Sequence, residues 1–281
     1  EGLQVNLYEK RPDMRQTEQS AGRSINLALS VRGLHALKEV GLEKQVLEQC
    51  LPMRGRLMHT QDNPESDETT LSFQAYGLFE HEYINSISRP YLNQILMDAA
   101  EAAGVNILFN QRCDGMDFNT GHTFFTDLND NNTYTITDTP MIGADGVGSA
   151  LRSSLIQRLR VNYSQDYLEH GYKELSIAPG PEGNFQCDSE SLHIWPRGSF
   201  MLIALPNPDK TFTCTLFLPF DGDPGFDQLQ TKAQLHTFFN REFPDALALM
   251  PNLAQEFFEN PTGVLSTIRC GPWFVDDKLL L

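Results

Sequence analysis

Apolar and polar positions along the first part of the chain predict strands and helices in turn. Short apolar runs predict strands at residues 4–8, 55–59, 71–74, 83–88 and 105–109. Apolar residues recur at helical spacing over residues 31–49, with Gly33 and Gly41 as weak points, and over residues 90–103. A helix followed directly by a strand is typical of α/β layers.

The rest of the chain is predicted to be richer in strands. Alternating runs predict a β-meander over residues 112–137, and a brief strand at 141–144 precedes a helix that begins at Ser149. Further strands are predicted at residues 171–177, 192–195, 200–205, 212–218, 264–269 and 278–281, and helices at 232–241 and 252–258. This order predicts a mixed α/β chain in which a nucleotide-binding layer is interleaved with a β-sheet domain.

One predicted strand, at residues 200–205, is apolar on both faces. Its odd-numbered positions share one face and are Met201, Ile203 and Leu205. Its even-numbered positions share the other and are Phe200, Leu202 and Ala204. Periodicity alone therefore predicts a buried central strand and not the wall of a pocket.

Charge and cysteine content exclude several classes of protein. The 281 residues include 37 acidic and 21 basic ones, a formal charge of −16, which argues against a general nucleic-acid binder because phosphate backbones attract clustered Lys and Arg. No apolar run approaches the roughly 20 residues of a membrane span, and residues 1–10 lack the pattern of a signal peptide. The five cysteines form no CxxC pair, so we expect reduced, mostly buried thiols in a cytosolic setting and no metal site.

Glu9 ends the first predicted strand. A carboxylate at this place in a dinucleotide-binding unit accepts hydrogen bonds from a ribose diol. The glycine-rich turn that should precede it by about 20 residues is absent from the sequence. Glu9 is therefore either a ribose ligand or a solvated charge.

Residues 145–152, with the sequence DGVGSALR, follow a short strand and open a helix. Backbone N–H groups at such a helix start can bind an anion, with Arg152 adding positive charge. The alternative is an Asp-Gly turn followed by Ser149 as the helix N-cap.

Four further segments accompany these two motifs along the chain. They are residues 22–30 (GRSINLALS), 53–56 (MRGR), 88–93 (SRPYLN) and 193–197 (HIWPR). With Glu9 and residues 145–152, the chain closely resembles the kynurenine 3-monooxygenases, a family of single-component, FAD-dependent aromatic hydroxylases. The resemblance runs from Gln4 to the last strand. The segments 22–30 and 193–217 carry its family-specific part.

The resemblance implies FAD as the cofactor and assigns its ligands residue by residue. Glu9 would hold the adenosine ribose, with Lys10 and Arg11 near the adenine. Ala28 and the neighbouring Leu27 would lie along the isoalloxazine, where small apolar residues allow close backbone approach to a flat ring. Arg89, at a helix start, would contact the polar edge of the flavin or the pyrophosphate.

The resemblance implies two further cofactor contacts later in the chain, at Cys113 and Asp145. Cys113 would touch the adenosine mainly through its backbone, so that its thiol is expected to be inert. Asp145 would support the ribityl and pyrophosphate region. NADPH is implied as the co-substrate that reduces the flavin, and O2 as the oxidant.

The substrate implied by the resemblance is L-kynurenine. Arg56 matches the family's carboxylate-binding arginine and Tyr76 its tyrosine partner; without the resemblance they would be a surface ion pair and a half-buried core tyrosine. The apolar slot for the ring is implied to consist of Leu192, Met201, Ile203, Leu205 and Phe217. His193 and Trp195 are expected to be packing groups, and no catalytic acid or base is assigned because the substrate's amino group already activates the ring.

The resemblance also implies how the chain is divided. We expect a Rossmann-like FAD-binding domain at residues 1–155, with 50–88 on the substrate side, a β-rich substrate domain at 156–270, and a return to the first domain at 271–281. Relative to the family, the sequence lacks the early GxGxxG and the later Gly-Asp-Ala-Ala-His segment. We therefore expect an incomplete enzyme that is inactive by itself.

Alternatives remain open at this stage. The protein could be a related flavin hydroxylase with another aromatic acid as substrate, or an inactive fragment that acts as a binding or folding module. A bacterial source, which segments 170–175 and 260–263 favour, would place the protein in the cytoplasm, and a eukaryotic source at the mitochondrial outer membrane. A homodimer is one expected state.

Overall fold

The computed structural model describes residues 2–16, 26–61, 69–79, 81–137 and 140–281. By internal contacts the chain divides into two compact units. The first unit contains Glu1–Gln19, Leu96–Tyr167 and Ser266–Leu281, and the second contains Ser20–Ile95 and Leu168–Leu265. Each unit is therefore built from separate stretches of sequence.

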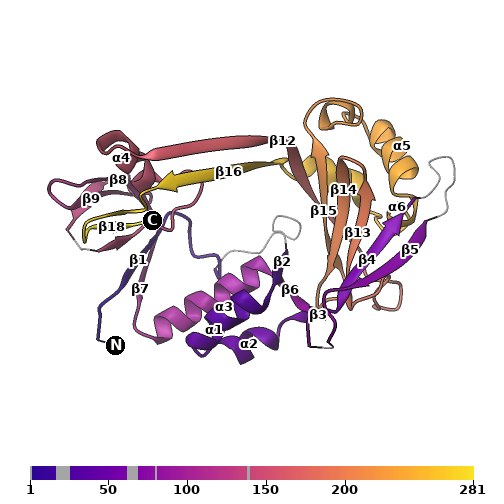
Figure 1. Ribbon diagram of the computed structural model, residues 1–281, viewed down its shortest axis with the longest axis horizontal. Coiled ribbons are helices and arrows are strands. Elements are labelled where there is room, and N and C mark those ends of the chain that lie inside the picture. Colours follow the sequence, from indigo (N-terminus) through magenta and orange to yellow (C-terminus); the bar gives the residue numbers. More distant parts are fainter. Residues whose placement is uncertain (1, 17–25, 62–68, 80, 138–139) are drawn as a thin grey trace. The chain divides into compact units, whose positions relative to one another are not determined.

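The first unit holds three small sheets, the helix at Ala150–Arg158 and the end of a longer helix (Figure 1). Strands β1 (Asn6–Glu9) and β7 (Asn106–Phe109) pair in parallel. The predicted meander is confirmed as β8 (Gln111–Asp117), β9 (His122–Asp127) and β10 (Thr133–Ile136). The third sheet consists of β11 (Met141–Ile142), β18 (Leu279–Leu280) and β17 (Phe274–Val275). Helix α4 (Ala150–Arg158) buries Leu151 and Leu155 in a cluster with Met116 and Leu279.

The second unit begins with a small sheet and two short helices. Strands β2 (Asn26–Leu29), β6 (Ile84–Ser88) and β3 (Leu51–Met53) form the sheet. The predicted helix over 31–49 is wrong as a single element, because it is divided into α1 (Val31–Glu39) and α2 (Glu43–Leu47). Gly41 adopts a φ of 76°, and the N–H groups of Gly41 and Leu42 donate to the carbonyls of Lys38 and Leu37, which is a Schellman helix end. Helix α3 (Arg89–Ala102) starts in this unit and ends in the first.

A seven-stranded sheet dominates the second unit (Figure 1). Its order is β16 (Gly263–Gly271), β12 (Asn162–Ile177), β15 (Phe212–Pro219), β14 (Phe200–Pro206), β13 (Ser191–Arg197), β4 (Gly55–Thr60) and β5 (Thr70–Ala75). One face packs against α5 (Lys232–Glu242), α6 (Pro244–Leu247), α7 (Leu253–Glu259) and the 3-10 turn at Phe226–Gln228. We call this the covered face and the opposite one the open face.

The structure therefore confirms the predicted mixed α/β class. It differs from the sequence analysis in the length of β12, predicted only for 171–177, and in α6 and β3, which were not predicted. It also groups residues 20–95 with the large sheet, whereas the sequence analysis placed only 50–88 on that side. The functional assignment of the domains stays a prediction.

Candidate functional site

Successive side chains of strand β14 point alternately to the covered face and to the open face. Phe200, Leu202 and Ala204 belong to the buried cluster under the helices. Met201 and Ile203 point to the open face, where Met201 is 37% exposed while Leu202 is 0% exposed. The prediction of a central strand is confirmed, but the prediction that it is buried on both faces is wrong, because the open face becomes accessible towards Met201.

The register of the neighbouring strands places the other predicted substrate residues on the same face. Met201 lies opposite Phe217 of β15, Ile203 opposite Ile194 of β13, and Leu192 opposite Arg56 of β4. Paired residues in a sheet point to the same side. Six predicted substrate residues therefore share the open face: Arg56, Leu192, Met201, Ile203, Leu205 and Phe217.

The seventh, Tyr76, lies directly beside Arg56. It follows β5, and its N–H donates to the carbonyl of Arg54 at 3.2 Å. The Arg56 guanidinium carbon is 4.7 Å from the centroid of the Tyr76 ring. A Cβ at Gly55 would come within 2.5 Å of the Gln74 carbonyl oxygen, so only glycine allows β4 and β5 to approach this closely here.

The polar groups of this pair are left free. Among the described residues, Arg56 has no carboxylate within ion-pair distance, and the buried hydroxyl of Tyr76 has no hydrogen-bond partner. Burial raises the pKa of Tyr76, while the charge of the Arg56 guanidinium and its approach to the hydroxyl act in the opposite direction. The surface ion pair considered as an alternative for Arg56 is therefore not present in this part of the chain.

A hydrogen-bond network that the sequence analysis missed ties β2 to the ends of β14 and β15. The side-chain amide of Asn26 donates to Asn207 Oδ1 at 2.6 Å and to Ser86 Oγ at 3.1 Å. Its Oδ1 accepts from the hydroxyl of Thr213 at 3.2 Å, and Asn207 Nδ2 donates to Thr213 Oγ1 at 3.0 Å. The network joins segments 22–30 and 193–217, and an asparagine within an apolar run was the only signal of it.

The predicted flavin contact Ala28 lies on the same face of β2 as Asn26. Asn26 and Ala28 are two residues apart on β2 and so share a face, while Leu27 and Leu29 pack on the other side. Ala28 is exposed. Arg89, the first residue of α3, is half-buried and has no hydrogen bond or ion pair within the described residues. Both residues of the second unit are thus available to a ligand.

In the first unit, Glu9 ends β1 as predicted. Its Oε1 accepts from the backbone N–H of Arg11 at 2.9 Å, and the Arg11 guanidinium is 3.9 Å away. Lys10 and Arg11 are exposed, and the Glu9 side chain is 41% exposed. The strand end therefore presents an accessible carboxylate with a second oxygen for a diol, although the role as a ribose ligand stays a prediction.

The helix start at residues 145–152 is satisfied by its own side chains. Asp145 Oδ2 accepts from the N–H of Ala150 at 2.8 Å, and Ser149 Oγ caps the N–H of Arg152 at 2.9 Å. The Arg152 guanidinium turns back to donate to the carbonyls of Gly146 and Val147. The chain's own side chains thus occupy the N–H groups of Ala150 and Arg152, and the predicted Ser149 cap is confirmed, while the anion site and the cofactor role of Asp145 stay predictions.

Burial makes four of the cysteine thiols poor nucleophiles, those of Cys50, Cys113, Cys187 and Cys214. All five are free; Cys214 is buried and the other four are half-buried. Burial raises the pKa of the Cys113 thiol to about 11. A thiol with this pKa is protonated at neutral pH and is a poor nucleophile, which supports the inert role expected for Cys113.

His193 and Trp195 lie on the covered face and form a buried polar chain. Trp195 is 0% exposed, and its Nε1 donates to Asp245 at 2.9 Å. His193 Nε2 donates to the carbonyl of Asp188 at 2.8 Å, so in neutral His193 the Nδ1 accepts from His59 Nε2 at 2.9 Å. His59 Nδ1 lies 2.7 Å from Asp245 Oδ2, within hydrogen-bond distance. These groups are internally satisfied, which confirms that His193 and Trp195 are packing groups.

A family model described as FAD binding domain matches residues 1–216. The chain belongs to the FAD binding domain family. Membership of this family identifies FAD as the cofactor, as the resemblance implied. The residues that contact it stay predictions.

Several curated relatives of this FAD binding domain chain are named kynurenine 3-monooxygenase. It is 47% identical over 284 residues to that of Myxococcus xanthus, covering 100% of this chain and 59% of the relative. It is 42% identical over 281 residues to that of Stenotrophomonas maltophilia (100% and 60%) and 43% identical over 281 residues to that of Dictyostelium discoideum (100% and 58%). The chain thus spans about three-fifths of the length of these relatives.

Solved structures share the fold of this FAD binding domain chain at low identity. 2-Methyl-3-hydroxypyridine-5-carboxylic acid oxygenase is 18% identical with a TM-score of 0.72, covering 99% of this chain and 68% of that one. PqsL of Pseudomonas aeruginosa is 14% identical with a TM-score of 0.65, covering 99% and 71%. These likenesses confirm the predicted fold of the aromatic-hydroxylase type.

The described residues contain neither a membrane-spanning helix nor a cluster of metal ligands. None of the helices in this part of the chain has the length and apolar character needed to cross a bilayer. No three His, Cys, Asp or Glu side chains within the described ranges could together hold a metal ion.

Proposed function

We propose that the protein hydroxylates L-kynurenine to 3-hydroxy-L-kynurenine, using FAD, NADPH and O2. The names of the relatives that match the whole chain at 42–47% identity support this substrate. The structural observation that carries the proposal is the contact of Arg56 with Tyr76 at the edge of an apolar sheet face. A free cation beside apolar residues suits an aromatic molecule that carries a carboxylate.

The substrate's amino-acid tail would bind at the Arg56–Tyr76 pair. The Arg56 guanidinium provides two parallel N–H donors for the carboxylate. The buried hydroxyl of Tyr76, which lacks a partner among the described residues, would donate a further hydrogen bond. Ordering of this hydroxyl by the substrate removes the cost of leaving it unpaired.

The aromatic ring would lie along the open face. Leu192 is the register partner of Arg56, so the apolar surface begins next to the carboxylate site. Met201 and Phe217, which pair with each other, continue it across β14 and β15. This surface excludes water from the ring and fixes which carbon is presented for reaction.

Residues in both units fit FAD by their chemistry. Glu9 offers an accessible carboxylate to a diol, Arg89 an unpaired guanidinium to an anion, and Ala28 an exposed small side chain to a flat ring. When bound, FAD reduced by NADPH supplies the O2 chemistry of ring hydroxylation. No side chain is assigned as acid or base, because the amino group of the substrate activates the neighbouring ring carbon.

The test uses the intact protein loaded with FAD. We expect kynurenine to stimulate NADPH oxidation and to yield 3-hydroxykynurenine. Arg56→Met should raise the KM for kynurenine by about tenfold to a hundredfold, the value of a charge-assisted hydrogen bond, and Arg54→Met, an exposed arginine already paired with Glu190, should not. Absence of kynurenine-stimulated oxidation refutes the proposal, and an unchanged KM in Arg56→Met favours a different aromatic acid as substrate.

Two further properties belong to the same proposal. Bacterial relatives predominate among the matches, which supports the cytoplasmic location predicted for a bacterial protein. The predicted homodimer would be tested by light scattering on the intact protein.

A further inference from the structure

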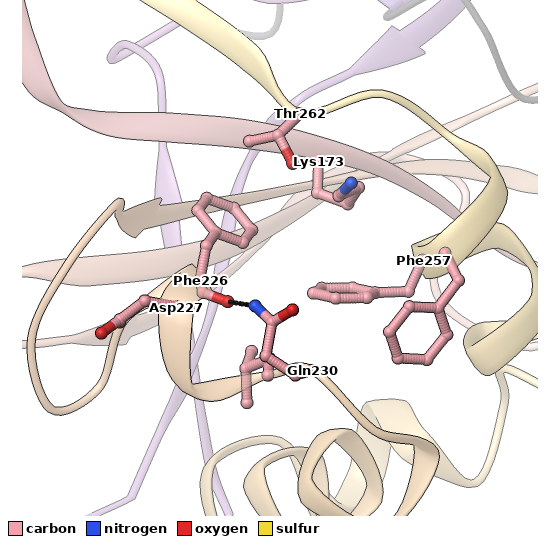
Figure 2. A pocket seen from close by; sticks show the side chains of 8 residues that line it. Lys173, Phe226, Asp227, Gln230, Phe257 and Thr262 are labelled. Atoms are coloured by element: carbon pink, nitrogen blue, oxygen red, sulfur yellow. Dashed lines mark hydrogen bonds between the residues drawn. The ribbon is translucent and has the colours of Figure 1, made fainter.

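A cavity lies on the covered face, away from the residues assigned to kynurenine. It has a volume of about 290 Å³, close to the lower limit for ligand pockets. Figure 2 shows the side chains that line it, which include Lys173, Phe226, Leu229, Gln230, Phe257 and Phe258. All of them belong to the second unit.

Lys173 is the one cation in this lining. It is 5% exposed, and its Nζ donates to the carbonyl of Asn260 at 2.7 Å. The Nζ also lies 5.1 Å from the centroid of the Phe257 ring. None of the described carboxylates comes within ion-pair distance of it, and burial lowers its pKa. An ammonium group has three donors, so a buried positive charge with two unused donors borders the cavity.

The remaining lining suits a flat apolar group. The Phe226 and Phe257 rings are 6.2 Å apart between centroids, and Phe258 packs on Phe257 edge to face at 5.3 Å. Phe258 is 44% exposed, so the cavity opens to solvent on its side. Gln230 is held by a hydrogen bond to the carbonyl of Phe226 at 3.1 Å, drawn in Figure 2.

The acidic residue of the lining does not neutralise the lysine. Figure 2 shows the Asp227 carboxylate directed away from Lys173. It accepts instead from the side chain of Gln228 at 2.8 Å. The charge that the cavity offers to a ligand is therefore positive.

We propose that this cavity binds a small aromatic carboxylate, with the carboxylate on the Lys173 ammonium and the ring against Phe257 and Phe226. The carboxylate accepts hydrogen bonds from the two unused N–H groups, and the ring buries apolar surface against the phenylalanines. Lys173 lies opposite Leu216, a covered-face residue, so the sheet itself separates this site from Arg56. The site is independent of the proposed kynurenine reaction.

Benzoate is the probe, and titration calorimetry on the intact, FAD-loaded protein measures its binding. All variants carry Arg56→Met, so that benzoate binding on the open face is suppressed. Lys173→Met keeps the length of the side chain and removes its charge. Lys210→Met is the matched control, because Lys210 also lies over a phenylalanine ring, that of Phe185 at 4.5 Å, but outside the cavity.

We expect millimolar benzoate to bind, Lys173→Met to weaken it at least tenfold, and Lys210→Met to change it less than twofold. Benzyl alcohol, which has the ring without the charge, should bind at least tenfold more weakly than benzoate. If Lys173→Met fails to fold by circular dichroism, Phe258→Ala at the exposed rim should weaken benzoate at least threefold. The proposal is overturned if benzoate does not bind, or if benzyl alcohol binds as tightly as benzoate. It is also overturned if Lys173→Met binds benzoate as tightly as the protein with Lys173 does. Where Lys173→Met does not fold, unchanged binding to Phe258→Ala overturns it.

Discussion

Replacing Asn26 by alanine removes the link between β2 and the ends of β14 and β15. Four hydrogen bonds are lost, to Asn207 at 2.6 Å, to Ser86 at 3.1 Å, to the carbonyl of Pro206 at 3.5 Å and from Thr213 at 3.2 Å. Each is worth about 0.5–1.5 kcal/mol net. Asn207 and Thr213 keep the bond between them at 3.0 Å, which limits the damage. We therefore expect the free energy of unfolding to fall by about 2 kcal/mol.

Urea unfolding of the intact protein, followed by the fluorescence of the buried Trp195, measures this loss. Asn106→Ala is the control, because the Asn106 amide is exposed and reaches only Asn6 at 3.3 Å; its effect should stay below about 0.5 kcal/mol. A double-mutant cycle with Asn207→Ala should give a coupling energy of about 1 kcal/mol. If Asn26→Ala and Asn106→Ala shift the midpoint equally at unchanged slope, the network does not stabilise the unit and the reasoning is refuted.

Three other outcomes are expected. Tyr76→Phe should raise the KM for kynurenine by about tenfold with little change in kcat, since it removes one hydrogen bond to a charged group, and steady-state kinetics decide this. Burial alone would raise the pKa of Asp245, but hydrogen bonds from His59 and Trp195 bring it below its ordinary value. The ionised carboxylate therefore stabilises the fold above an unfolded pKa of about 3.9, and this stabilisation is lost as the pH falls through the folded pKa. Urea midpoints measured from pH 7 down to pH 3 should fall less steeply in Asp245→Asn than in the unmodified protein. Cys113, with a pKa of about 11, should react with iodoacetamide at pH 7 far more slowly than a free thiol, and labelling at the rate of free cysteine would contradict this.

Elements that depend on neighbours in sequence were predictable. The meander over 111–136 follows from alternating residues and turn asparagines, and the Ser149 cap from its place before a helical run. The break at Gly41 was visible as a weak point, but the length of each half depended on the Schellman bonds that Gly41 makes possible. Local chemistry therefore determined these features.

Features that depend on distant residues were not predictable. Asn26 and Thr213 are 187 positions apart, and only the folded sheet brings their side chains together. Likewise, alternation along β14 could not reveal which face the helices cover, since both faces are apolar.

The alternation of side chains along β14 determines which amino-acid substitutions each face of the strand tolerates. Phe200, Leu202 and Ala204 are fixed by close packing, so substitutions there cost stability. Met201 and Ile203 border open space, and larger or smaller side chains at these two positions can reshape the surface without disturbing that packing. The covered-face residues of β14 are thus constrained by packing, and its open-face residues by the ligand. Ligand preference can therefore diverge among descendants of this chain while the packing under the helices is kept.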